Sequence, residues 1–422
     1  MDLRGLVKEA ALAAFVALIV AIPLAGFDLS QQGTANGAQI GFRPSWVAIA
    51  VVTVFVGRLV IGLLPRPQRR ERPPVVSLFI ARHQRVLGLT GLAIAIVWPY
   101  LPFSSDYLVD LATEVIIYMM LGWGLGVVVG LAGLLNLGYA AFYAVGAYTL
   151  ALTSAYWAWG FWEALPLAGV TAAAVGILLA LPVLRLRGDY LAIVTLGFGE
   201  IIRIILINWQ SFTYGPNGIN GVPRPTFFGL PLVARAPRGG ETFAQFFHID
   251  FSLSQRYIFL YFVTLALAIV VNLFILRLRR LPIGRAWEAL REDEIASRAL
   301  GINPVGVKLS AFAVGALLAG FAGVFFAARQ SFVSPESFNF QESATVLAIV
   351  VLGGMGSQLG IALAAIILVT LPEFGRDFAQ FRMLLFGAAM VGIMIWRPRG
   401  FFSLRTPSIR LGEDRPLVEV PK

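Results

Sequence analysis

Long apolar segments alternate with short polar segments along nearly the whole chain. About 20 consecutive apolar residues cross a bilayer as an α-helix, which satisfies its own backbone polar groups. The pattern therefore predicts an all-α, polytopic membrane bundle of about 10–12 transmembrane helices rather than a β-barrel. The predicted passes are residues 10–26, 45–64, 86–103, 112–133, 136–158, 164–184, 190–210, 256–276, 305–328, 343–355, 358–372 and 381–396.

The pair of segments at 343–355 and 358–372 is interrupted by glycines. Its first member is too short for a normal span of about 20 residues. The pair forms either two passes or one broken, re-entrant segment, and the total number of helices depends on which form it takes.

Composition supports a membrane protein. Only 13% of the residues are charged and 58% are hydrophobic, whereas about 25% of the residues of a soluble domain are charged. The chain has no Cys, and its two histidines, His83 and His248, lie far apart. We therefore expect no disulfide framework, no metal site and no cofactor.

The net charge of +10 would suit a nucleic-acid binder, but its distribution indicates orientation instead. Predicted cytoplasmic segments hold 23 of the 33 Lys and Arg residues. This is the positive-inside bias of membrane proteins, and it places both termini in the cytoplasm. No nucleic-acid partner is needed to explain the charge.

Residues 65–85 are rich in Arg and Pro, which is typical of a cytoplasmic linker at a domain boundary. We therefore expect residues 1–85 to form a two-helix membrane segment followed by this basic linker. Residues 86–400 would form the main membrane domain, and residues 401–422 a cytoplasmic tail.

Residues 284–304 are polar, although they lie between two strongly apolar segments. Good helix formers from 286 to 300 predict a short amphipathic helix, which Gly301 ends and Pro304 keeps from resuming. This helix either docks in a groove on a partner or is a solvated connector. Its apolar face is predicted to carry Trp287, Leu290, Ala299 and Leu300.

Residues 127–138 resemble residues 349–360, with Gly133 matching Gly354 and Gly138 matching Gly360. Apolar segments interrupted by glycine in matching halves are typical of broken helices around a central transport path. In that interpretation Asn136 and Gln358 contact a polar solute as it crosses. The alternative is close helix packing through small residues.

The predicted external loop 211–255 contains Gly215-Pro-Asn-Gly218, a combination typical of a turn. Such a loop is either a rigid docking surface for an external protein or a plain connector.

No phosphate-binding GxxxxGK[ST] loop, HExxH or GxSxG motif is present. A membrane enzyme is therefore unsupported, and any ATPase that drives transport must be another chain. An ion-coupled transporter usually carries unpaired acids deep in its bundle. Here Glu114 and Glu342 fall at the predicted outer ends of spans, where water reaches them.

Several motifs resemble those of the branched-chain amino acid ABC-transporter permeases of the LivM type, in the same order along the chain. The first 85 residues resemble the additional N-terminal segment of longer members of this family. The matching motifs are residues 130–148, 187–203, 215–218, 290–303 and 352–356.

The resemblance implies that residues 86–400 are the permease domain of a bacterial importer in the inner membrane. The implied partners are two cytoplasmic ATP-binding subunits, a second, different permease, a periplasmic protein that delivers Leu, Ile or Val, and the lipid bilayer. Urea-type permeases share the pattern, and an ion-coupled secondary transporter is the alternative from another class.

The resemblance also assigns roles to residues of this chain. The implied ATPase-coupling residues are Trp287, Glu288, Arg291, Glu292, Asp293, Glu294 and Gly301. The binding-protein contact would include Pro216, Asn217 and Gly218. The glycine pattern, independently of the resemblance, assigns the transport path to Gly133, Asn136, Gly138, Gly354 and Gln358. No catalytic residue is expected.

Overall fold

A computed structural model describes residues 44–63, 75–102, 104–183, 188–234, 242–248 and 250–374, with a few positions within 10–42 and with Leu186 and Gly387. The chain divides into two compact units, Met1–Pro73 and Pro74–Lys422. Most of the predicted span 10–26 and all of the predicted span 381–396 except Gly387 lie outside the described residues.

The described residues of the first unit include a short antiparallel strand pair and the apolar helix α2 (Pro44–Leu63). Strand β1 (Phe27–Leu29) pairs with β2 (Ile40–Phe42), with Asp28 opposite Gly41. Helix α2 is 20 residues long, which is about the length needed to cross a bilayer. Its position agrees with the predicted span at 45–64.

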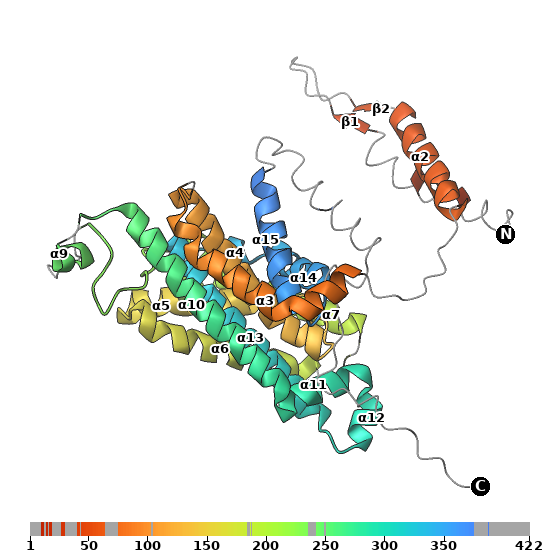
Figure 1. Cartoon of the computed structure of the whole chain (residues 1–422). Helices are drawn as coiled ribbons and strands as arrows, with labels where there is room; N and C mark the ends of the chain where they lie inside the picture. Colours follow the sequence, from red (N-terminus) through yellow and green to blue (C-terminus); the bar gives the residue numbers. More distant parts are fainter. Residues whose placement is uncertain are drawn as a thin grey trace, which may run out of the picture. The chain divides into compact units, whose positions relative to one another are not determined.

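The described part of the second unit is mostly helical (Figure 1). Among the described residues, five helices are long and apolar enough to cross a membrane, so the protein is an all-α membrane protein. Its elements are α3 (Val75–Val97), η1 (Trp98–Tyr100), α4 (Asp106–Leu125), η2 (Gly126–Leu131), α5 (Tyr139–Trp157), α6 (Phe161–Val183), α7 (Asp189–Asn208), α8 (Gln210–Thr213), η3 (Gly215–Asn217), β3 (Ile219–Asn220), α9 (Phe243–Phe247), α10 (Leu253–Arg280), α11 (Pro282–Glu292), α12 (Glu294–Ala299), α13 (Pro304–Gln330), β4 (Phe332–Val333), η5 (Pro335–Phe338), α14 (Phe340–Gly353) and α15 (Gln358–Phe374).

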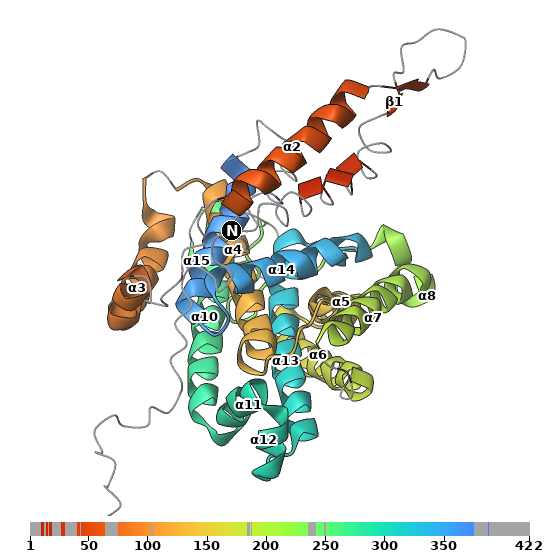
Figure 2. The same ribbon diagram turned by 90° about the vertical axis from the view of Figure 1, so that its right-hand side faces the viewer.

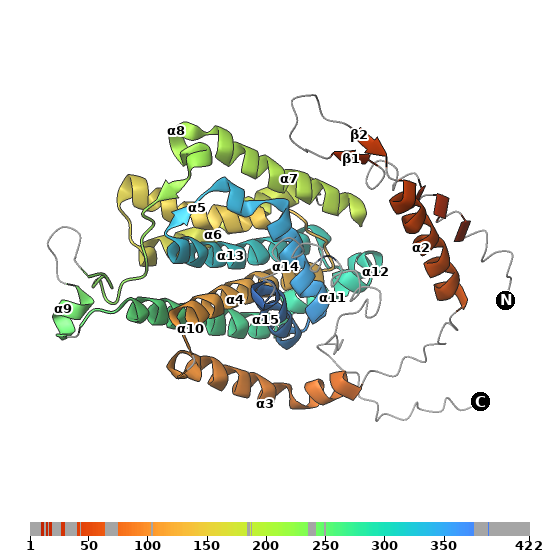
Figure 3. The same cartoon turned by 90° about the horizontal axis from the view of Figure 1, so that it is seen from above.

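Helix α13 lies at the centre of this unit. It packs against α4, α5 and α6, while α10 packs on the far side of α4 (Figure 3). One end of α13 lies beside α11 and α12, and the other end lies beside α14 (Figure 2). The helix therefore joins the two ends of the unit.

Glycines allow α13 to approach its neighbours at backbone distance. A Cβ atom added at Gly320 would lie 2.6 Å from the Ala168 carbonyl oxygen of α6. The Gly315 carbonyl accepts a hydrogen bond of 2.9 Å from the Tyr139 hydroxyl of α5. Because lipid supplies no hydrophobic force between helices, such small-residue contacts contribute strongly to membrane packing.

The amphipathic segment differs from the predicted single helix. It forms two helices, α11 and α12, which are separated at Asp293 where the backbone is extended (φ −156°, ψ 113°). Trp287 and Leu290 are buried, whereas Ala299 and Leu300 are exposed. The prediction was wrong at these two positions because the break at Asp293 removes them from the face that carries Trp287.

The predicted linker also differs, because α3 begins at Val75 and occupies the second half of residues 65–85. The glycine-broken pair is confirmed as two short helices, α14 and α15, of 14 and 17 residues. The predicted external loop contains α8, η3, β3 and α9. Strand β3 pairs with β4, so this loop is attached to the chain that follows α13.

We expect Gly320→Ala to destabilise the protein and Gly197→Ala to leave it intact or slightly more stable. The added methyl would collide with α6 at Gly320 and cost about 1–3 kcal/mol. Nothing lies within 4 Å of the same methyl at Gly197, where replacing a helical glycine gains up to about 1 kcal/mol. Melting of the detergent-solubilised chain, followed by size-exclusion chromatography, measures both effects. Equal melting temperatures for the two variants would contradict the packing argument.

Candidate functional site

Trp287 anchors α11 against the start of α13. Its side chain is fully buried, and the indole Nε1–H donates to the Val307 carbonyl at 3.2 Å and to the Ser310 hydroxyl at 2.9 Å. The turn before α11 is tight, because a side chain at Gly284 would collide with the end of α10. Helix α11 is therefore fixed to the bundle through its apolar face.

Arg291 joins α11 to the first glycine break, which we define as residues 130–138. Its guanidinium donates a hydrogen bond to the Gly130 carbonyl. The side-chain stem packs on Gly133, where an added Cβ would lie 2.8 Å from Arg291 Cγ. Gly133 has φ of +71°, a conformation that glycine adopts without strain.

Arg279, at the end of α10, joins α11 to the second glycine break, residues 353–358. Its Nη2 lies 3.3 Å from Glu288 Oε1, and its Nη1 donates to the Gly356 carbonyl at 3.1 Å. The two breaks also meet each other, since a Cβ at Gly130 would lie 2.8 Å from the Gly356 nitrogen. The structure thus places both glycine breaks beside α11.

Helix α12 is held by its own charged residues. The Asp293 carboxylate caps it by accepting from the amides of Ile295 at 2.7 Å and Ala296 at 3.0 Å. Glu294 lies 3.2 Å from Lys308 on α13, and 3.4 Å from Arg298, one turn further along α12. Glu292 is exposed.

Gly301, the last predicted coupling residue, follows α12 with φ of +83° and nothing within 4 Å of an added Cβ. Gly301 therefore ends this segment, as predicted, and does so in a left-handed conformation.

The remaining predicted path residues lie within the two breaks. Asn136 is buried, and its Oδ1 accepts from the Gly138 amide at 2.9 Å. Gly138 packs directly on the Thr195 carbonyl of α7. Gly354 ends α14 with φ of +94°, and the Gln358 carbonyl accepts from the Trp123 indole at 2.9 Å. Gly138 therefore permits a close approach of two backbones, and Gly354 permits a positive φ. The packing interpretation is also consistent with these roles.

In the predicted external loop, Pro216 and Asn217 are exposed, while Gly218 is buried. A side chain at Gly218, which has φ of +66°, would collide with the Phe332 ring and the Val333 carbonyl of β4. The tip of this turn faces outward, and its base is fixed to β4.

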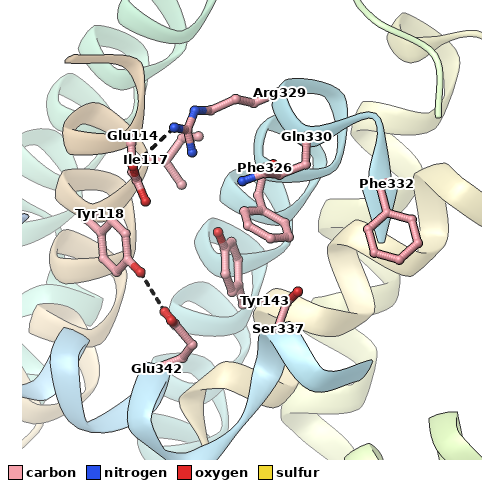
Figure 4. A pocket seen from close by; sticks show the side chains of 10 residues that line it. All are labelled: Glu114, Ile117, Tyr118, Tyr143, Phe326, Arg329, Gln330, Phe332, Ser337 and Glu342. Carbon is pink, nitrogen blue, oxygen red and sulfur yellow. Dashed lines mark hydrogen bonds and ion pairs between the residues drawn. The ribbon is translucent and has the colours of Figure 1, made fainter. Parts of the chain in front are cut away.

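A second feature, the Arg329 cavity, lies at the other end of α13. Its volume is about 310 Å³, and it is lined by residues of α4, α5, α13, β4, η5 and α14 (Figure 4). The lining residues are Glu114, Ile117, Tyr118, Tyr143, Phe326, Arg329, Gln330, Phe332, Ser337 and Glu342.

Charged groups in this cavity are held by strong hydrogen bonds. Arg329 makes a bidentate contact with Asp110, at 2.9 Å and 2.7 Å, and also lies 3.1 Å from Glu114. Glu342 accepts a 2.6 Å hydrogen bond from the Tyr118 hydroxyl. Glu342 lies in the first turn of α14, as predicted, but the prediction was wrong for Glu114, which lies about two turns inside α4 because that helix begins at Asp106. Both carboxylates line one cavity.

Sequence reasoning missed the roles of Arg279 and Arg329, which it counted only as part of the charge distribution. It also missed Asp110, Tyr118 and Tyr143. One available signal was the rarity of charge, because an ionisable side chain within an apolar segment usually has a specific partner. The identity of those partners was not readable, since Arg329 and Asp110 are 219 positions apart.

Comparison with known proteins shows which family the chain belongs to. A family model described as "Branched-chain amino acid transport system / permease component" matches residues 107–394. The chain belongs to this permease family. A second model, described as a domain of unknown function, matches residues 6–98. The resemblance drawn from the motifs is therefore confirmed.

Two permease relatives match almost end to end. Both are high-affinity branched-chain amino acid transport system permease proteins LivM, and both are 50% identical to this chain. The Escherichia coli protein aligns over 96% of each chain, and the Salmonella typhimurium protein over 92% of this chain and 93% of its own length.

A more distant relative is a probable LivM permease of Methanocaldococcus jannaschii. It is 26% identical over 56% of this chain and 66% of its own length. No solved structure matches the chain.

We expect Asp293→Ala to loosen α12 and Asp293→Asn to leave it intact. Alanine removes the cap of two backbone amides, which costs about 1 kcal/mol, whereas asparagine caps almost as well as aspartate. Hydrogen exchange of the amides at 295–300 should therefore become about fivefold faster in the alanine variant only. Unchanged exchange in Asp293→Ala would show that other contacts hold α12.

Proposed function

We propose that this chain is the permease subunit of a bacterial ABC importer for branched-chain amino acids. It forms the membrane path together with a second, different permease. Two cytoplasmic ATP-binding subunits drive it, and a periplasmic binding protein delivers leucine, isoleucine or valine. The near end-to-end similarity to two LivM permeases supports this class of transporter and its substrate. The chain has no phosphate-binding loop of its own.

The observation that carries the mechanism is the attachment of α11 to both glycine breaks. Arg291 donates a hydrogen bond to the Gly130 carbonyl, and Arg279 donates one to the Gly356 carbonyl. Arg279 also forms an ion pair with Glu288 on α11. We infer that ATPase closure moves α11 and α12 and that these arginines carry the movement to the breaks. The exposed side of this pair, which includes Glu292, is the proposed ATPase contact.

The proposed orientation follows from this role. Helices α11 and α12 lie on the cytoplasmic side of the inner membrane, and both termini are cytoplasmic, in agreement with the positive-inside bias. Pro216 and Asn217 then face the periplasm, where their exposure supports a contact with the binding protein. Gly218 would support that contact by fixing the turn to β4.

Asn136 and Gln358 are the proposed polar groups of the path, together with Gly133, Gly138 and Gly354. Among the described residues, the buried side-chain nitrogens of Asn136 and Gln358 have no hydrogen-bond partner. An unpaired buried amide costs about 1–3 kcal/mol, and a passing polar solute would offset that cost. This supports a role beyond helix packing.

The first test is a mild-detergent pull-down of the tagged chain from its native membranes, with mass spectrometry of the proteins that accompany it. We expect two ATP-binding subunits and a second permease to be recovered. Reproducible recovery of the folded chain alone would favour an ion-coupled transporter, whose uptake stops when the ion gradient is dissipated although ATP remains.

We also expect Arg291→Ala and Arg279→Ala to separate ATP hydrolysis from uptake in the reconstituted importer. Each variant removes a hydrogen bond between a charged group and a backbone carbonyl at a glycine break, worth about 1.5–3 kcal/mol. Uptake per ATP hydrolysed should fall about tenfold, within the usual range of coupling energies.

Arg280→Ala is the matched control, because Arg280 is the neighbour of Arg279 and is exposed. It should leave uptake per ATP unchanged. The mechanism fails if all three variants behave alike, or if neither Arg291→Ala nor Arg279→Ala affects coupling.

A further inference from the structure

The Arg329 cavity is not used by the proposed coupling mechanism, although it has the features of a ligand site. Its volume of about 310 Å³ is within the range of about 300–1,000 Å³ that is typical of small-molecule pockets. Arg329 is 19 residues along α13 from Ser310, the partner of Trp287, so the cavity lies roughly 30 Å from the docked end of α11.

The lining has a charged side and an aromatic side (Figure 4). Glu114 and Tyr118 come from α4, and Glu342 comes from the start of α14. The rings of Phe326 and Phe332 lie across from them, with Tyr143 between the two sides (Figure 4). Such a lining suits a small molecule that has a charged end and an apolar end.

The charges of the cavity do not balance among its lining residues. Arg329 is the one guanidinium of the lining. It makes a bidentate contact with Asp110 and lies 3.1 Å from Glu114, while a third carboxylate, Glu342, accepts from Tyr118. Arg224 approaches the same end of α13, where it donates to the Ala328 carbonyl, but it is not part of the lining. Removing charge from water is costly unless it is paired, so a cationic group in the cavity would be stabilised.

The cavity is also connected to the turn proposed to meet the binding protein. Phe332 lines the cavity, and the buried Gly218 packs on its ring. Strands β3 and β4 join the two segments through the pair Asn220 and Phe332. A solute released beside Pro216 and Asn217 would therefore arrive next to the cavity.

We propose that the Arg329 cavity binds an α-amino acid on its way across, with the ammonium group between Glu114 and Glu342. The aliphatic side chain lies against Phe326 and Phe332. An ammonium group has three hydrogen-bond donors and a full positive charge, which match two carboxylates. The identity of the ligand rests on the proposed transport function, whereas the preference for a cation rests on the cavity alone.

Thiol labelling tests the cavity, because the chain has no Cys and every introduced thiol is unique within it. Ser337→Cys and Gln330→Cys place a thiol in the lining, and Asn217→Cys places one on the exposed turn. The full importer in lipid nanodiscs is treated with methanethiosulfonate reagents that carry either a trimethylammonium or a sulfonate group.

We expect the cationic reagent to label both cavity thiols about tenfold faster than the anionic one, with a much smaller difference at Asn217→Cys. Adding Glu342→Gln should remove most of this preference. Adding Tyr118→Phe, which removes the hydrogen bond but keeps the carboxylate, should preserve it. Equal rates for the two reagents, or no labelling of either cavity thiol, would overturn the proposal.

Protection by ligands then identifies the occupant. Millimolar leucine should slow labelling of the cavity thiols at least severalfold, whereas 4-methylpentanoate, which is leucine without its amino group, should not. Equal protection by 4-methylpentanoate or by sodium chloride would rule out recognition of the ammonium group of an amino acid. Labelling requires neither ATP nor uptake. Leucine protection without ATP-driven uptake would therefore reject the proposed function but support binding of an amino acid in the cavity.

Discussion

The second unit depends on the close packing of α13 against α4, α5 and α6. Gly320 packs on the backbone of Ala168, and Gly323 packs on the backbone of α5. The Gly315 carbonyl accepts a hydrogen bond from the Tyr139 hydroxyl. In a bilayer, lipid tails are as apolar as the helices, so this interdigitation and its hydrogen bonds carry much of the association energy. A side chain larger than hydrogen at these positions would push apart the helices that form both sites.

Because α13 is held on several sides, its two ends are connected by one continuous element. The end near Pro304 carries the Trp287 hydrogen bonds and the ion pair between Lys308 and Glu294. The end near Gln330 carries Arg329 and leads into β4. A helix of 27 residues is about 40 Å long, so α13 reaches most of the way across a membrane. Contacts at one end and the cavity at the other therefore share a single rigid support.

The sequence was informative wherever the signal was local. Apolar runs predicted the membrane fold, Gly133 and Gly354 marked the two breaks, and Gly301 marked the end of α12. The break at Asp293 was missed because its neighbours are good helix formers. Its carboxylate caps the amides ahead of it, which competes with continuing the helix.

Contacts between distant parts of the chain were beyond the sequence. Arg291 and Gly130 are 161 positions apart, and only the fold brings them together. Propensity and periodicity describe neighbours along the chain, so they could not identify the arginines that hold the glycine breaks or the groups that enclose the Arg329 cavity.

The element that Arg291 contacts, η2, is a π-helix. Residues Gly126–Leu131, which continue α4, form a π-helix, whose turn contains an extra residue compared with an α-helical turn. If this turn tightened to α-helical spacing, the chain beyond it would shift by one residue, about 1.5 Å along the axis and about 100° around it. The π-helix therefore holds one extra residue in the turn that contains the Gly130 carbonyl. A change of register there would rotate the chain that follows without unfolding α4.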